Sequence, residues 1–176
     1  VEFTELQAIV VKEGSITSKD VINSDELFVD AFADTRLNLQ TSAAVMDIRM
    51  EEASRGDFNV DVDSLNISLN QRAEAYVYAV NEVSLVDLEQ NGSLTLEGTS
   101  DRIEVNLTDN ARLKAEKMET AAVNAKLENS TVARLNVHRE LELSAIDNAR
   151  TYLYGNPRIT ILEFLNTAQL IKKEEQ

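Results

Sequence analysis

The chain has 176 residues, 43% of them hydrophobic, which is enough for one domain with a continuous core. Its formal net charge of −14 argues against nucleic acid and anionic membrane surfaces as partners, because both are bound through clustered Lys and Arg. It has no cysteine and no apolar run long enough to span a membrane, so we expect no disulfide, no thiolate metal site and no membrane insertion.

The first part of the chain is polar and irregular. Between Gly14 and Leu39, acidic and amide side chains are frequent and the alternation of apolar and polar residues is weak. We expect residues 1–34 to form an irregular first coil or cap, because uncovered strands at the end of a stack invite edge-to-edge association.

Residues 35–168 repeat with a period of 19. The clearest marks are four asparagines, each followed by a small residue: Asn91, Asn110, Asn129 and Asn148. Alternating apolar and polar residues precede and follow each one, a pattern typical of strand, tight turn and strand. Such short strands cannot each close a core, so we expect an all-β, single-domain, right-handed parallel β-helix of about seven stacked coils.

The four asparagines are expected to form the corners of the coils. A tight corner needs a residue at positive φ, and after Gly, Asn adopts this conformation most readily. We therefore assign them a structural role and no catalytic one. Near Arg134, which breaks the inward column, the apolar residues of neighbouring coils fall out of phase, which predicts a local bulge.

Two pairs of tyrosines occupy the same place in two different coils. Tyr76 and Tyr78 flank one inward apolar residue, and Tyr152 and Tyr154 flank another. All four should therefore project from one outer sheet, with the two pairs four coils apart. Exposed aromatic pairs are common in carbohydrate and protein contact surfaces, so these tyrosines are the binding candidates. The alternative is that they cover the sheet or pack under the terminal segments.

The end of the chain is apolar from Ile159 to Leu170 and then charged. We expect the last coil to close within the apolar stretch and residues 169–176 to form a charged, fraying tail. The start at Val1, without an initiator Met, suits a mature form whose leader has been removed.

Three stretches resemble a known family. Residues 152–159 (YLYGNPRI) look like the terminal Tyr-Gly-Asn-Pro signature of the autotransporter adhesin head domain, or GIN domain, of secreted proteins in Bacteroides-like bacteria. Residues 3–11 look like that family's first strands, and the Asn-centred corners stand where the family has Gly-Ser-Gly. The resemblance implies a secreted or surface-exposed β-helix for adhesion, a structural corner at Gly155 and Pro157, and no established catalytic residues.

Few side chains suit catalysis. His138 is the only histidine, so an imidazole triad or a transition-metal site would lack partners, and we expect it to be an outward strand residue. Asp61 and Asp63 share one face of a strand, a spacing compatible with glycoside hydrolysis but equally with two solvated carboxylates. We expect no enzymatic activity and no cofactor.

Three acidic residues each precede a corner asparagine and would stack one coil apart: Asp109, Glu128 and Asp147. A hard cation such as Ca²⁺ would suit oxygen ligands there. The glycines of calcium-binding nonapeptide repeats are missing, however, so we expect no metal site.

These features favour a noncatalytic, secreted or cell-surface β-helix that serves adhesion or cell-envelope interaction, at the surface or in the periplasm of a Gram-negative bacterium. Its partner would be a protein or glycan surface of a host or of the envelope. Two alternatives stay open: a structural module that self-assembles through its ends, as bactofilin-like proteins do, and an envelope polysaccharide enzyme using Asp61 and Asp63. A homo-oligomer stays open as well.

Overall fold

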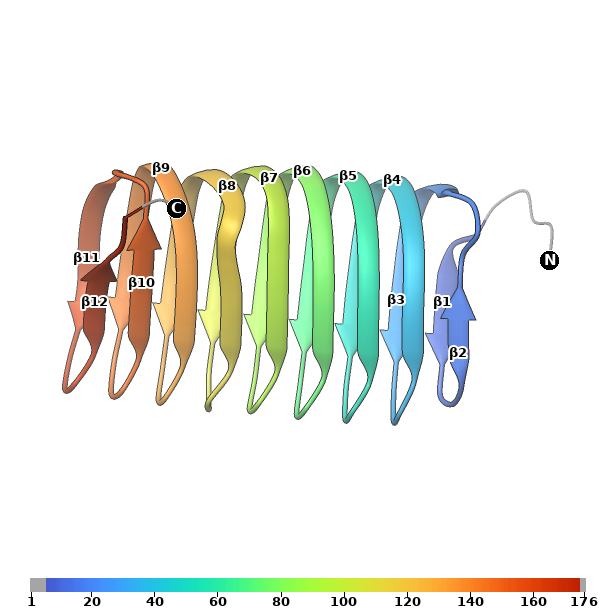
Figure 1. Cartoon of the computed structure of the whole chain (residues 1–176), viewed down its shortest axis with the longest axis horizontal. Coiled ribbons are helices and arrows are strands. Elements are labelled where there is room, and N and C mark those ends of the chain that lie inside the picture. The colour runs from blue at the N-terminus through green and yellow to red at the C-terminus, as the bar shows by residue number, and fades with distance from the viewer. Residues whose placement is uncertain (1–5, 175–176) are drawn as a thin grey trace.

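The computed structural model describes residues 6–174 as one parallel β-solenoid, a rod built of stacked coils (Figure 1). Every regular element in this range is a strand, and the coils make about nine turns with a spacing of about 19 residues. The strands are β1 (Ala8–Val11), β2 (Ser15–Thr17), β3 (Ile22–Ala31), β4 (Arg36–Met50), β5 (Arg55–Leu69), β6 (Glu74–Leu88), β7 (Ser93–Leu107), β8 (Arg112–Leu127), β9 (Val132–Ala145), β10 (Arg150–Tyr154), β11 (Arg158–Phe164) and β12 (Gln169–Lys172).

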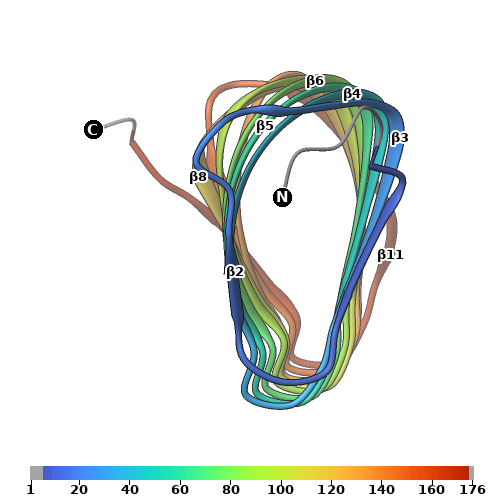
Figure 2. The same cartoon turned by 90° about the vertical axis from the view of Figure 1, so that its right-hand side faces the viewer.

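Each full coil consists of one long strand and one tight turn. The strand bends at an apex near its middle, so its two halves lie on opposite sides of the rod (Figure 2). We call the side formed by the first halves of β4–β9, together with β2, β10 and β12, the front sheet. The back sheet contains the second halves together with β1, β3 and β11. Seen from the N-terminal end, the chain runs clockwise as it recedes, so the solenoid is right-handed as predicted (Figures 1 and 2).

The alternation of side chains places the core inside the coil. In β5, Phe58, Val60 and Val62 are buried while the residues between them are exposed. Parallel pairing puts equivalent residues of successive coils in columns, such as Leu39, Phe58 and Val77. A column of buried small residues follows the tight turns: Thr35, Ser54, Ala73, Gly92, Ala111, Thr131 and Ala149. At the Asn129 corner the buried residue is Thr131, whereas the predicted Ser130 is exposed.

The predicted bulge is confirmed, and it lies in β8. This strand has 16 residues and β9 has 14, whereas β7 has 15, and the register shifts on both sides of β8. Arg134 was wrongly placed in the inward column, because the longer strand moves the next coil by one residue. Ala133 and Leu135 are the inward residues, and the Arg134 side chain lies outside.

All four predicted corner asparagines lie in the tight turns, but only two of them have the expected positive φ. Asn110 and Asn129 have positive φ, but at the other two corners the preceding residue, Gln90 or Asp147, has it. The cause is the turn geometry, since the first central residue of each four-residue turn takes the left-handed conformation. The residues at this place are Ala33, Glu52, Gln71, Gln90, Asp109, Asn129, Asp147 and Asn166.

Both ends of the chain contribute strands to the stack. In the predicted N-terminal cap, β1 pairs with β3, and β2 pairs with β4. At the other end, the first four residues of the predicted tail form β12, which pairs with β10. Residues 3–5, which belong to the family resemblance, and the last two residues of the tail lie outside the described residues.

Candidate functional site

The candidate tyrosines all lie on the front sheet. One outward column passes in register through Tyr76, Thr95, Lys114, Arg134 and Tyr152 on β6–β10. Tyr78 and Tyr154 lie two residues further along β6 and β10. The two pairs are therefore four coils apart on one surface, as their positions in the repeat predict.

Tyr76 and Tyr78 present their rings to solvent. Their exposed fractions are 38% and 44%, large for aromatic side chains. The Tyr76 hydroxyl donates a hydrogen bond of 3.0 Å to the Glu97 carboxylate on the next coil. The same carboxylate forms an ion pair of 3.2 Å with Lys117, one coil further along the rod. The hydrogen bond to Glu97 raises the pKa of Tyr76, because it stabilises the phenol over the phenolate.

Tyr152 and Tyr154 are half-buried, and their surroundings differ from those of the first pair. The Tyr152 ring has the Arg134 guanidinium 5.8 Å and the Lys173 ammonium 5.5 Å from its centroid, distances at which cation–π attraction operates. Ile171 of β12 lies beside Tyr152 in register. The terminal strand thus partly covers this pair, so Tyr76 and Tyr78 are the more accessible rings.

The corner side chains link the coils together. The Asn129 amide donates to Asp109 and the Asn166 amide donates to Asp147, each across one coil. Asp109 and Asp147 share the corner column with Asn129 between them, so the three predicted acids do not stack in succession. Glu128 lies one residue before the column and pairs with Lys126 at 2.9 Å. Within residues 6–174, no group of three or more His, Cys, Asp or Glu side chains could hold a metal ion.

The residues considered for chemistry lie apart on the outside of the coil. Asp61 and Asp63 are both exposed, the solvated arrangement rather than an enclosed catalytic pair. His138 is exposed near the apex, where it lines a shallow hollow of about 260 Å³ together with Glu119 and Arg139. No described contact joins His138 to the two aspartates.

Gly155 has the conformation that only glycine adopts readily. Its φ is +80°, and a Cβ atom there would lie 2.1 Å from the carbonyl oxygen of Val137. Pro157 follows it in the same bend, just before β11. The structure thus forms the bend that the family resemblance implies at these residues.

The fold and the open front sheet define the class: a repeat protein that presents a long, rigid surface rather than an enclosed pocket. Residues 1–157 match the family described as "Putative auto-transporter adhesin, head GIN domain", so the chain belongs to this family. Neither the curated proteins nor the solved structures gave a match. The family suggests a surface or secreted location and is typically non-enzymatic. The described residues contain no helix that could cross a membrane.

Proposed function

We propose that this chain is a noncatalytic adhesion module at the cell surface of a Gram-negative bacterium, and that it holds its ligand on the front sheet. The observation that carries the proposal is the pair of exposed rings of Tyr76 and Tyr78, two residues apart on one strand. The strand is paired on both sides, with β5 and β7, which fixes the backbone that carries both rings, and the hydrogen bond to Glu97 orients the Tyr76 ring. Preorganised aromatic side chains lower the entropic cost of binding.

The double variant Tyr76→Ala/Tyr78→Ala is expected to lose binding on a glycan array. An aromatic hot spot contributes about 2 kcal/mol or more, so we expect affinity to fall by roughly 30-fold or more. The matched control is Tyr76→Phe/Tyr78→Phe, which keeps both rings and removes the hydrogen bond to Glu97. Circular dichroism would establish that both variants are folded. Unchanged binding by the alanine variant would exclude this tyrosine pair as the contact surface.

A second function, self-assembly through the ends of the rod, is favoured by the C-terminal coil. All seven residues of β11 are exposed, including Ile159 at 42% and Ile161 at 51%. These two residues are in register with the buried Leu141 and Leu143, so they occupy core positions with no further described coil covering them.

The N-terminal end offers a complementary surface. An apolar hollow of about 740 Å³ opens there, lined by residues that include Ile9, Ile16 and Leu39. Both ends of a parallel stack have unpaired strand edges, and their strands run in the same direction, so a second copy could continue the stack head to tail. Such a contact does not close on itself and would produce filaments.

In light scattering, the protein is expected to increase in mass with concentration, whereas Ile159→Lys/Ile161→Lys should stay monomeric, because burying two charges at the contact is unfavourable. Val80→Lys/Val83→Lys is the matched control, since these valines are equally exposed but lie at the apex and on the back sheet, away from the ends. A protein that stays monomeric at high concentration would rule out assembly through the ends.

A further inference from the structure

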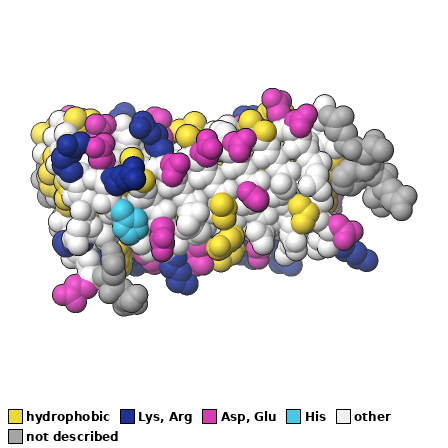
Figure 3. Space-filling view, turned by 90° about the horizontal axis from the view of Figure 1, so that it is seen from above, with side chains coloured by type: hydrophobic (Ala, Val, Ile, Leu, Met, Phe, Trp, Pro, Cys, Tyr) yellow, Lys and Arg dark blue, Asp and Glu magenta, His cyan; other side chains and the backbone are white. Residues whose placement is uncertain are grey.

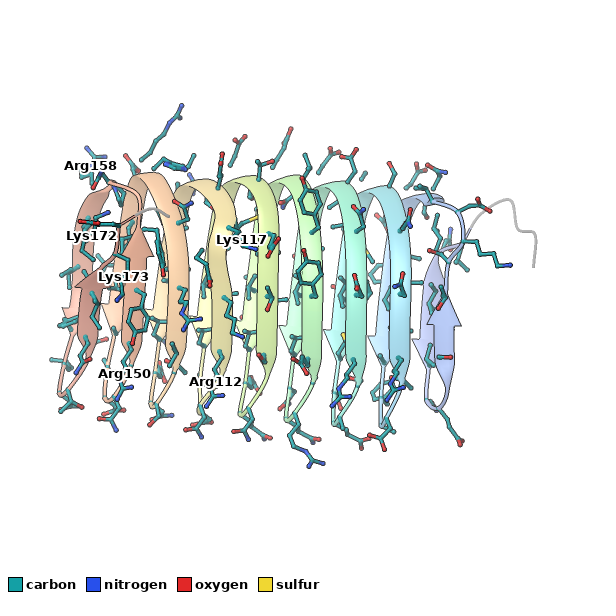
Figure 4. The ribbon with its side chains drawn as sticks, in the orientation of Figure 1. Arg112, Lys117, Arg150, Arg158, Lys172 and Lys173 are labelled. Atoms are coloured by element: carbon teal, nitrogen blue, oxygen red, sulfur yellow. The ribbon has the colours of Figure 1, made fainter. Side chains whose placement is uncertain are left out.

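Basic side chains gather on the front sheet near the C-terminal end of the rod, although the chain as a whole has a net charge of −14. The apex of the coils, seen from above, carries acidic side chains one after another along the middle of the rod and a separate group of basic side chains toward the C-terminal end (Figure 3). Figure 4 shows Arg112 and Lys117 on β8, Arg150 at the start of β10, and Lys173 near the chain end. We define the basic strip as Arg112, Lys114, Lys117, Arg134, Arg150 and Lys173.

Much of the positive charge in this strip is not neutralised. Lys117 pairs with Glu97, and Arg134 lies 3.7 Å from Glu116. Arg112, Lys114 and Arg150 make no ion pair with any of the described residues, and all three are exposed.

Two cations of the strip are direct neighbours. Lys114 and Arg134 are in register on the adjacent strands β8 and β9. Like charges directly opposite each other in a sheet are destabilising. Glu116 offsets the charge of Arg134, but no described carboxylate pairs with Lys114, so a negatively charged group bound between the two cations would relieve the remaining repulsion.

We propose that the basic strip binds an anionic polysaccharide, bearing carboxylate or sulfate groups, that lies along the rod across β6–β10. The inference rests on the proposed function, since it names the ligand class of the same front sheet. Along one column the ligand meets the Tyr76 ring, the Thr95 hydroxyl, the cations Lys114 and Arg134, and the Tyr152 ring. At about 4.8 Å per coil, this column is about 19 Å long, enough for several sugar units.

The surroundings of the strip favour a polysaccharide over a nucleic acid. DNA carries one charge per about 1.7 Å and requires cations along its whole length. Here the basic strip spans only β8–β10 and the end of β12, and the rest of a strongly acidic protein would repel a densely charged polymer. A polysaccharide with one charge per sugar unit can place its anions at the strip and the apolar faces of its sugars on the tyrosine rings.

Biolayer interferometry at low and physiological salt tests the proposal, with polygalacturonate as the carboxylated probe, dextran sulfate as the sulfated probe, dextran as the neutral one and a single-stranded oligonucleotide. We expect the protein to bind one or both anionic polysaccharides, with an affinity that falls as salt rises. Arg112→Gln/Lys114→Gln/Arg150→Gln should bind about tenfold more weakly or worse and show a flatter salt dependence. Comparing the two anionic probes shows whether carboxylate or sulfate is preferred.

The control is Arg49→Gln/Arg102→Gln/Lys126→Gln, which removes the same charge from the back sheet and should bind like the parent protein. The proposal is overturned if the protein binds neither anionic polysaccharide, if the control loses as much affinity as the front-sheet variant, or if the oligonucleotide binds more tightly than both polysaccharides. Tyrosine-dependent binding of a neutral glycan without anion binding would refute this inference alone. Binding of no glycan of either kind would refute the proposed glycan contact as well.

Discussion

Phe58→Ala is expected to lower the free energy of unfolding by about 3–5 kcal/mol, the range for removing a buried aromatic ring from a core. Phe58 is fully buried and lies between Leu39 and Val77 in the stacked column. Its ring occupies the space beside Gly56, where a Cβ atom would lie 2.1 Å from the ring carbon Cε2. Since both neighbouring coils are held by continuous backbone pairing, they cannot close readily around the cavity.

The contact between Gly56 and Phe58 makes a double-mutant cycle informative. Gly56→Ala should destabilise the parent protein, because the new methyl group collides with the ring. In the Phe58→Ala background the same substitution should be neutral or stabilising, because the methyl group enters the emptied space and alanine costs less backbone entropy than glycine. Denaturant unfolding followed by circular dichroism would measure all four proteins. Additive effects would show that the two residues do not share this space.

The repeat was visible in the sequence, but the number of coils was underestimated. About seven coils were expected, and the structure has about nine turns. The additional strands lie at the ends: β1–β3 in the stretch expected to be an irregular cap, and β12 in the stretch expected to be a fraying tail. Parallel backbone pairing to an existing coil suffices to form these strands, and this pairing leaves no local motif in the sequence.

The spacing of the asparagines concealed an insertion. Asn110 and Asn129 are 19 residues apart, yet Asn129 stacks on Asp109, because the intervening strand β8 is one residue longer than β7. The next strand, β9, is shorter, so by the corner at Asp147 the corners are again in step with the 19-residue period. A sequence shows only the net distance between corners, whereas the inward or outward direction of a side chain depends on the bulge between them.

The sequence placed the tyrosines correctly and missed the basic strip. Period-2 alternation was enough to put Tyr76 and Tyr152 on one sheet. The partial cover over Tyr152 was missed because it comes from β12, the next strand of the front sheet, which lies in the stretch expected to be a fraying tail. The strip was overlooked because the net charge averages over the whole surface. Writing the coils in register would have revealed Lys114 beside Arg134, but that register depends on the bulge.

Gly155→Ala is expected to destabilise the protein strongly. A disfavoured backbone conformation alone costs about 1–3 kcal/mol, and we expect a larger loss here. Two effects add at this position: φ is +80°, and the new Cβ atom would lie 2.1 Å from the Val137 carbonyl oxygen. Val137 belongs to β9 and is paired with Thr120, so it cannot retreat without disturbing that pairing. Gly98→Ala should behave alike, since φ there is +116° and the Ala79 oxygen would be 2.0 Å away.

Gly14→Ala separates these two effects, because Gly14 has a φ of +93° but no atom within 4 Å of a Cβ. Its cost should therefore reflect backbone strain alone, and thermal unfolding should give the largest losses of Tm for Gly155→Ala and Gly98→Ala. If Gly155→Ala cost no more than Gly14→Ala, the close approach to Val137 would not explain the glycine. If it costs more, the glycine of the Tyr-Gly-Asn-Pro bend is required where the chain passes directly over the backbone of the preceding coil.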